Sequence, residues 1–209
     1  MASPEDMEEM WNNPEVFKEW SKSGEKKGKV RFSQDEKKRP YLSRIEVKVF
    51  LYMSTKQVLK FKSYSTMQLQ KLYFRNTSSV LCALAELLSM RFVYGIGPNA
   101  GIMGLDYSTA FWLYMELGFR AYKVDSIDDL TKPFVSMYFG AAYFLWLSEY
   151  EGRERTPQFV VQAYIAGPKN VNFQETGPMW LKFEEALSYF EDIKKKDSLA
   201  NLLEDVEII

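Results

Sequence analysis

The sequence contains no histidine and only one cysteine among its 209 residues. Without histidine, the chain has no imidazole base, no Ser-His-Asp triad and no histidine ligand for a metal ion. The single cysteine, Cys82, excludes an intramolecular disulfide and a zinc site built from thiolates. We therefore predict neither a metal ion nor a cofactor, and one cysteine fits a reducing compartment.

Long apolar runs are also missing. No stretch reaches the roughly 18 consecutive apolar residues of a membrane-spanning helix. The first 20 residues are polar and acidic, whereas a secretory signal has a basic start and an apolar core. These features predict a protein without a membrane span that resides inside the cell, in the cytoplasm or the nucleus.

What the chain does contain is material for a helical core. Hydrophobic residues make up 46% of the sequence and aromatic residues 16%, which is enough for a globular domain. Apolar residues recur mostly at helical spacing, between loops marked by glycine and proline. In residues 76–79, the letters NTSS favour the start of a helix, because Ser, Thr and Asn cap helix N-termini. The predicted fold is all-α or mainly α, with helices within residues 4–20, 41–75, 78–92, 107–119, 134–152, 156–167, 179–196 and 197–209.

The predicted domain organisation follows from composition. Residues 1–40 are an acidic and then basic arm or linker, and residues 41–75 are a basic extension read as helical, although part of it alternates like a strand. Residues 76–196 form the main domain. Residues 197–209 form an amphipathic helix that could pack on the domain or dock on a protein partner.

Charge is distributed unevenly. Residues 1–21 carry a net charge of −5, residues 22–75 carry +11 and residues 76–209 carry −7, which sum to −1. A basic segment of this kind could bind nucleic acid, a membrane surface or another acidic partner. It could also pack on the acidic body of its own chain. We favour the second interpretation, because no nucleic-acid recognition motif is present.

One acid stands out in an apolar helix. Glu86 lies in the stretch SSVLCALAELLSMRF, residues 78–92. On a helix it shares a stripe with small or weakly polar residues such as Ser79, Cys82 and Ser89. Two interpretations follow: Glu86 marks the solvated stripe of a half-buried helix, or it lines a cleft as a catalytic carboxylic acid. Composition alone favours the first.

The order and spacing of four motifs resemble a known family. The letters ALAELL contain Glu86, and GIMG begins 15 residues later at Gly101. DDLTKPFVSMYFGAAYFLWL and AYIAGPKNV then follow. From about residue 78 to residue 191, the chain resembles the catalytic domain of soluble lytic transglycosylases and goose-type lysozymes. The resemblance implies a lysozyme-like helical fold, with Glu86 as the candidate acid/base and Met103, Tyr143 and Tyr164 as candidate groove residues for a glycan.

The chain departs from the family at four polar positions. A serine, a glutamine and two asparagines are replaced by Leu87, Gly104, Ser136 and Ile165. A buried sugar hydroxyl without a hydrogen-bond partner costs about 1–3 kcal/mol. These losses favour a binding scaffold over an enzyme.

The alternative is an active enzyme that cleaves β-1,4 bonds of an N-acetylhexosamine polymer. In the family, one Glu protonates the glycosidic oxygen and then acts as base, while the substrate's N-acetyl group assists. Glu86 could therefore act alone. We interpret the loop acids Asp106, Asp125, Asp128 and Asp129 as solvated or capping residues. The expected partners are a glycan or a protein bound through residues 22–75 or 197–209, and nucleic acid is the weakest candidate.

Overall fold

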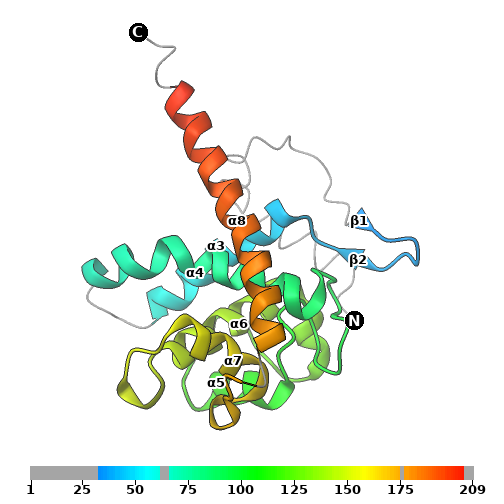
Figure 1. Ribbon diagram of the computed structural model, residues 1–209. Helices are drawn as coiled ribbons and strands as arrows, with labels where there is room; N and C mark the ends of the chain where they lie inside the picture. The colour runs from blue at the N-terminus through cyan, green and yellow to red at the C-terminus, as the bar shows by residue number, and fades with distance from the viewer. Residues whose placement is uncertain (1–32, 62–65, 175–176, 205–209) are drawn as a thin grey trace.

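A computed structural model describes residues 33–61, 66–174 and 177–204, and they are mainly helical (Figure 1). The mainly α prediction is confirmed. The elements are β1 (Ser33–Gln34), β2 (Pro40–Tyr41), α3 (Arg44–Phe61), α4 (Thr66–Ser89), α5 (Tyr107–Met115), η1 (Ile127–Thr131), α6 (Pro133–Ser148), η2 (Tyr150–Gly152), α7 (Pro157–Ala166), η3 (Pro168–Asn170) and α8 (Gly177–Glu204), where η denotes a 3-10 helix.

Helix α6 is the centre of the fold. Fifteen of its 16 residues are buried, and Trp146 alone is partly exposed. A helix that is apolar on every side is suited to a position surrounded by other helices. Accordingly, α3, α4, α5 and α7 all contact α6. Pro133 starts the helix, because its fixed φ suits the first helical position.

Helix α3 belongs to the same hydrophobic core as the helices that follow it. It packs on both α4 and α6. Its buried apolar side chains include Val47, Phe50, Leu51 and Val58, and each contributes about 1.5–3 kcal/mol when fully buried. Residues that precede the main domain in sequence are therefore part of its packing.

The N-cap predicted in residues 76–79 is wrong. These residues lie in the middle of α4, which runs without interruption from Thr66 to Ser89. No glycine or proline falls within this range to stop the helix. Ser79 is buried against the core, so packing outweighs the modest helix propensity of these polar residues.

At the end of the predicted arm, β1 and β2 form a short antiparallel hairpin. The turn is held by Asp35, whose carboxylate accepts hydrogen bonds from the backbone N–H groups of Lys37 and Arg39. The hairpin leads to the end of α4, where Tyr41 forms a β-bridge with Phe92. The remaining arm and the helix predicted in residues 4–20 lie outside the described residues.

The two C-terminal helices predicted in residues 179–196 and 197–209 are a single helix as far as Glu204. No glycine or proline separates them. At about 1.5 Å per residue, the 28 residues of α8 extend roughly 40 Å, and the C-terminal part of α8 projects from the body (Figure 1). Residues 205–209 lie outside the described part of the chain.

Three further helices were predicted close to their observed positions. Asp106 caps α5 by accepting a hydrogen bond from the backbone N–H of Thr109, and Thr156 caps α7 in the same way through Phe159. Helix α6 ends at Ser148, four residues before its predicted end at Gly152, and η2 (Tyr150–Gly152) takes up the remaining residues. Among the described helices, none has the length and hydropathy needed to cross a membrane.

Candidate functional site

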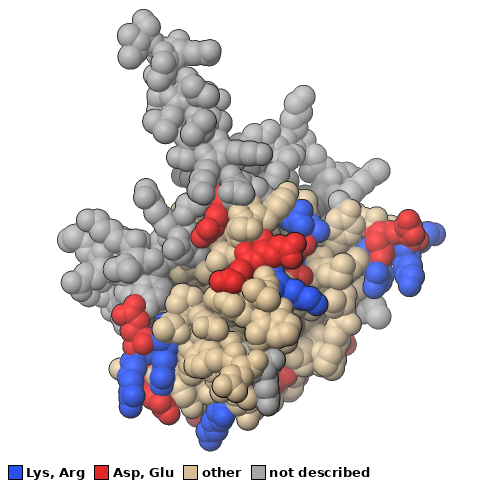
Figure 2. Space-filling view, viewed as in Figure 1, with Lys and Arg blue, Asp and Glu red and all other residues tan. Residues whose placement is uncertain are grey.

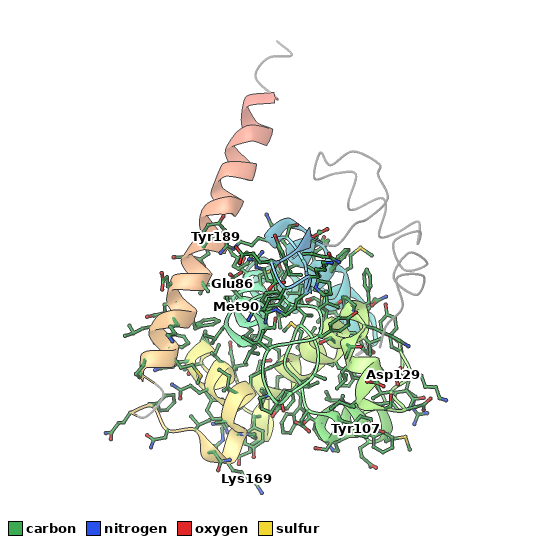
Figure 3. All side chains as sticks on the ribbon, turned by 90° about the vertical axis from the view of Figure 1, so that its right-hand side faces the viewer. Glu86, Met90, Tyr107, Asp129, Lys169 and Tyr189 are labelled. Atoms are coloured by element: carbon green, nitrogen blue, oxygen red, sulfur yellow. The ribbon has the colours of Figure 1, made fainter. Side chains whose placement is uncertain are left out.

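Glu86 lies in the last turn of α4, and its side chain is 21% exposed to solvent. The apolar residues around it in sequence face the core, including Leu81, Leu84 and Ala85, which are fully buried. The carboxylate therefore sits at the margin of the core on a helix that packing holds rigidly. Figure 3 shows Glu86 beside α8, near Met90 and Tyr189.

Two arginines hold the carboxylate of Glu86. Arg44 at the start of α3 donates from Nη2 to Oε1 over 3.1 Å and from Nε to Oε2 over 3.3 Å. Arg91 places its Nε 2.7 Å from Oε2. This second contact is an ion pair by distance, although the N–H direction falls outside hydrogen-bond geometry. Both carboxylate oxygens are thus engaged by guanidinium groups.

Arg44 connects three helices. Its guanidinium lies over the ring of Tyr189 on α8, 4.0 Å from the ring centre, while it also contacts Glu86 on α4. The hydrogen bond to Glu86 raises the pKa of Arg44, and partial burial opposes that rise. Cation–π and ionic contacts therefore join α3, α4 and α8 at one point.

Arg91 sits in a strained backbone segment. Met90 and Arg91 have φ of 50° and 66°, a left-handed conformation that costs a non-glycine residue free energy. The turn is held by Ser89, whose hydroxyl accepts from the Arg91 N–H. Arg91 also donates from Nη1 to the carbonyl of Leu42. Because of this backbone conformation at the end of α4, the Arg91 side chain contacts both Glu86 and Leu42, which lies just before α3.

The candidate groove residue Met103 lies in the core, fully buried. Its backbone N–H donates to the Ser136 hydroxyl over 3.1 Å, and its carbonyl accepts from the Tyr164 hydroxyl over 3.0 Å. Burial raises the pKa of Tyr164, so the phenol remains a neutral donor. Ser136, a departure from the family pattern, therefore has a structural role in holding the loop that contains Met103.

Glycines allow this loop to approach η1 and α6 closely. Gly101 has φ of +77°, and a Cβ there would lie 1.9 Å from the Leu130 carbonyl oxygen. A Cβ on Gly140 would lie 2.7 Å from the Met103 Cγ and 3.0 Å from the Tyr164 hydroxyl. The GIMG and GAAY motifs therefore serve backbone geometry and packing here.

Tyr143, the third candidate groove residue, is also buried, at the junction of α6 and α7. Its ring stacks on Trp146 with 5.9 Å between centres and lies 5.2 Å from the ring of Tyr164. Burial, with a smaller effect of Asp106, raises the pKa of Tyr143 to about 12. The three candidate groove residues thus lie close together on one side of α6.

Glu86 makes no direct polar bond to this group. Within the described residues, no hydrogen bond or ion pair joins Glu86 to Met103, Tyr143 or Tyr164. The catalytic and groove roles that the resemblance implies for these four residues stay predictions.

The loop acids are placed as capping or exposed residues. Asp106 caps α5, and hydrogen bonds from Ser108 and Thr109 lower its pKa although burial acts to raise it. Asp129 caps η1 by accepting from the backbone of Asp125 and Ser126. Across the described part of the chain, no three Asp, Glu or Cys side chains are grouped to hold a metal ion.

Comparison with protein-family models matches residues 76–187 to the transglycosylase SLT domain. The chain belongs to this family. The matched range covers more than half of the 209 residues and includes the end of α4, the GIMG loop, α5, α6, α7 and the start of α8. Searches of curated proteins and of solved structures found no match.

The residues that hold Glu86 come partly from outside the SLT match. Arg44 precedes the matched range and Tyr189 follows it, and sequence reasoning identified neither. Arg44 is 42 positions from Glu86, so local spacing gave no signal. The contact between Arg91 and Glu86 was easier to predict from the sequence, because a basic residue five positions after an acid at a helix end can turn back toward it.

Proposed function

We propose that this SLT-domain protein is a non-catalytic glycan-binding scaffold, in which Glu86 anchors the structure through ion pairs instead of acting as the acid. The observation that supports this most is the engagement of both Glu86 oxygens by Arg44 and Arg91. A general acid must bring a carboxyl oxygen within hydrogen-bond distance of the glycosidic oxygen. In this arrangement a glycosidic oxygen would have to compete with the guanidinium groups of Arg44 and Arg91 for the Glu86 carboxylate.

The replaced polar positions support the same proposal. Gly104 brings no side chain, and its backbone lies against Leu88. Ile165 and Leu87 are apolar and partly buried. A groove with fewer hydrogen-bonding side chains holds a sugar less rigidly, and cleavage requires more accurate positioning than binding.

The described residues on the face drawn in Figure 2 fit a glycan better than nucleic acid. On the face drawn in Figure 2, Lys and Arg side chains lie in small groups next to Asp and Glu, and uncharged residues cover much of the rest. Nucleic-acid surfaces need a continuous basic patch. Most of the basic segment of residues 22–75 lies outside the described side chains, so its role in binding a protein or nucleic acid stays a prediction, as does the intracellular location.

The test is an activity and binding assay on the full chain. Wild-type protein and the Glu86→Gln variant are incubated with peptidoglycan and with β-1,4 N-acetylglucosamine oligomers, and products are analysed by mass spectrometry. We expect retention on the insoluble polymer without release of anhydro-sugars by either protein. Glu184→Gln, at an exposed position on α8, is the matched control.

Release of anhydro-muropeptides by the wild type, abolished by Glu86→Gln and retained by Glu184→Gln, would establish the enzyme instead. Failure of the wild type to bind any acetamido glycan would overturn the glycan part of the proposal.

A further inference from the structure

Three of the large hydrophobic side chains that are exposed in the described part of the chain lie close together in sequence, directly after α4. Met90, Tyr94 and Ile96 are 56%, 41% and 48% exposed. The loop around them carries no charge, because residues 92–105 contain no Asp, Glu, Lys or Arg. An exposed and uncharged apolar loop of this kind is typical of a surface that contacts a protein partner or a membrane.

The β1–β2 hairpin lies directly beside this loop. The Val93 N–H donates to the Pro40 carbonyl over 3.0 Å, and the guanidinium of Arg39 lies 4.3 Å from the centre of the Phe92 ring. The pairing of the two segments is antiparallel, so Tyr94 and Arg39 lie at the same end of the ladder. The turn of the hairpin, which projects from the body in Figure 1, is therefore next to the apolar loop.

The hairpin turn presents basic side chains at this position. Lys37 and Lys38 are exposed, and within the described residues neither ammonium group forms an ion pair. Arg39 pairs with Asp35 of the same turn at 2.7 Å, and Glu36 is the only other acid of the turn. The basic side chains of the turn are thus not neutralised by acids of the helical body.

The chain that leads into the hairpin is also basic. Residues 22–32 contain five Lys and Arg against one acid, and they are followed directly by β1. The whole chain has a net charge of −1, but attraction between exposed charges is screened beyond about 10 Å. A local excess of basic residues therefore determines which molecules this face attracts.

We propose that the loop of residues 90–98 and the basic residues 22–39 form a docking surface for a membrane that contains anionic lipids. Tyr94 and Ile96 enter the boundary between headgroups and acyl chains, where tyrosine is favoured. The lysines and arginines lie among the anionic headgroups. Stable anchoring at a membrane takes two signals, and the apolar loop and the basic segment supply one each.

The apolar loop favours a membrane over nucleic acid as the partner. Nucleic acid would use the basic residues through its phosphates, whereas a membrane also accommodates exposed apolar side chains. The inference does not depend on glycan binding, because it involves a different surface and a different ligand.

The first test is sedimentation of the full chain with vesicles of phosphatidylcholine, prepared with and without phosphatidylserine. We expect binding only to vesicles that contain phosphatidylserine, and release as the salt concentration rises. Ile96→Ser should weaken that binding about tenfold, because it removes an apolar side chain from the lipid interface. Ile127→Ser, at a similarly exposed isoleucine (50%) on η1, should bind like the wild type.

The second test addresses the basic side chains with the double variant Lys37→Gln, Lys38→Gln. A lysine near an anionic surface contributes about fivefold to binding, so the double variant should weaken it roughly tenfold or more. The double variant Lys169→Gln, Lys182→Gln removes the same charge from exposed positions on η3 and α8, and it should bind nearly like the wild type. Thermal unfolding checks that all variants keep the fold.

Four outcomes would overturn the proposal. The first is absence of binding by the wild type to phosphatidylserine vesicles. The second is equal binding by the wild type and Ile96→Ser, which would reduce the contact to charge alone. The third is an equal loss for Ile96→Ser and Ile127→Ser, since the loop would then have no special role. The fourth is binding to a DNA oligomer without binding to vesicles, which would assign the basic residues to nucleic acid.

Discussion

Glu86 and Met103 are each held by side chains from distant parts of the chain, but by different chemistry. Around Glu86 the contacts are ionic and partly exposed, and they involve Arg44 from outside the SLT match. Around Met103 the contacts are neutral and buried hydrogen bonds inside the match: the Met103 N–H donates to the Ser136 hydroxyl, and the Met103 carbonyl accepts from the Tyr164 hydroxyl.

The difference shows which parts of the family pattern this chain retains. Motif residues that set backbone geometry keep that role, because a substitution there would clash with close neighbours. The acid at position 86 is retained as well, yet its partners are arginines on α3 and at the end of α4. Under the proposed function, Glu86 is retained as an anchoring residue, and the motif glycines are retained for backbone geometry.

The largest expected effect is in the buried region. Gly101→Ala should destabilise the protein by about 3 kcal/mol or more, since the new Cβ would meet the Leu130 carbonyl at 1.9 Å and φ is positive. Gly97→Ala, with no atom within 4 Å of the new Cβ, is the control. Urea unfolding measures both, and equal values would remove the geometric role assigned to the GIMG loop.

At the ionic region, Arg91 should matter more than Arg44, because its side chain is 18% exposed against 37% for Arg44. Arg91→Met should cost about 1–3 kcal/mol, as it leaves the Leu42 carbonyl without its side-chain donor. Arg44→Met should cost about 0.5–1 kcal/mol. Denaturant unfolding curves compare the two variants, and the reverse order would contradict the account of this region.

A smaller effect is expected for Tyr164→Phe, which removes the donor to the Met103 carbonyl. The expected loss in unfolding free energy is about 1–1.5 kcal/mol. Tyr143→Phe is the matched control, because no hydrogen bond of its hydroxyl is found among the described residues. Similar losses of unfolding free energy for Tyr164→Phe and Tyr143→Phe would mean that the Tyr164 hydrogen bond does not stabilise the protein.

The smallest effect concerns pH. The folded-state pKa of Asp106 is lowered below its usual value of 3.8, so its ionised form contributes stability above the unfolded pKa. That contribution is lost as pH falls from about 4 through the lower folded pKa. Asp106→Asn, which can still cap α5, should therefore differ from the wild type at pH 6, and the difference should shrink as pH falls below about 4. Thermal unfolding across this range tests the effect, and a constant difference would contradict it.

The sequence predicted much of the fold, because apolar spacing and Gly/Pro punctuation mark α5, α6 and α7 clearly. It failed at residues 76–79, where polar residues are accommodated inside a helix by packing. It also split α8 in two, because the basic run at residues 194–196 breaks the apolar pattern without breaking the backbone.

At the candidate site, the sequence singled out Glu86, and the family resemblance named Met103, Tyr143 and Tyr164 as groove residues, although the structure has all three buried. It could not locate Arg44, because a contact across 42 positions depends on how α3 packs against α4.

The most direct test of the central claim is a double-mutant cycle between Arg44 and Glu86. Unfolding free energies are measured for the wild type, Arg44→Met, Glu86→Gln and the double variant. An anchoring ion pair at this partly exposed position predicts a favourable coupling of about 0.5–1 kcal/mol. Zero coupling, together with glycan cleavage that Glu86→Gln abolishes, would contradict the account and restore Glu86 as the acid.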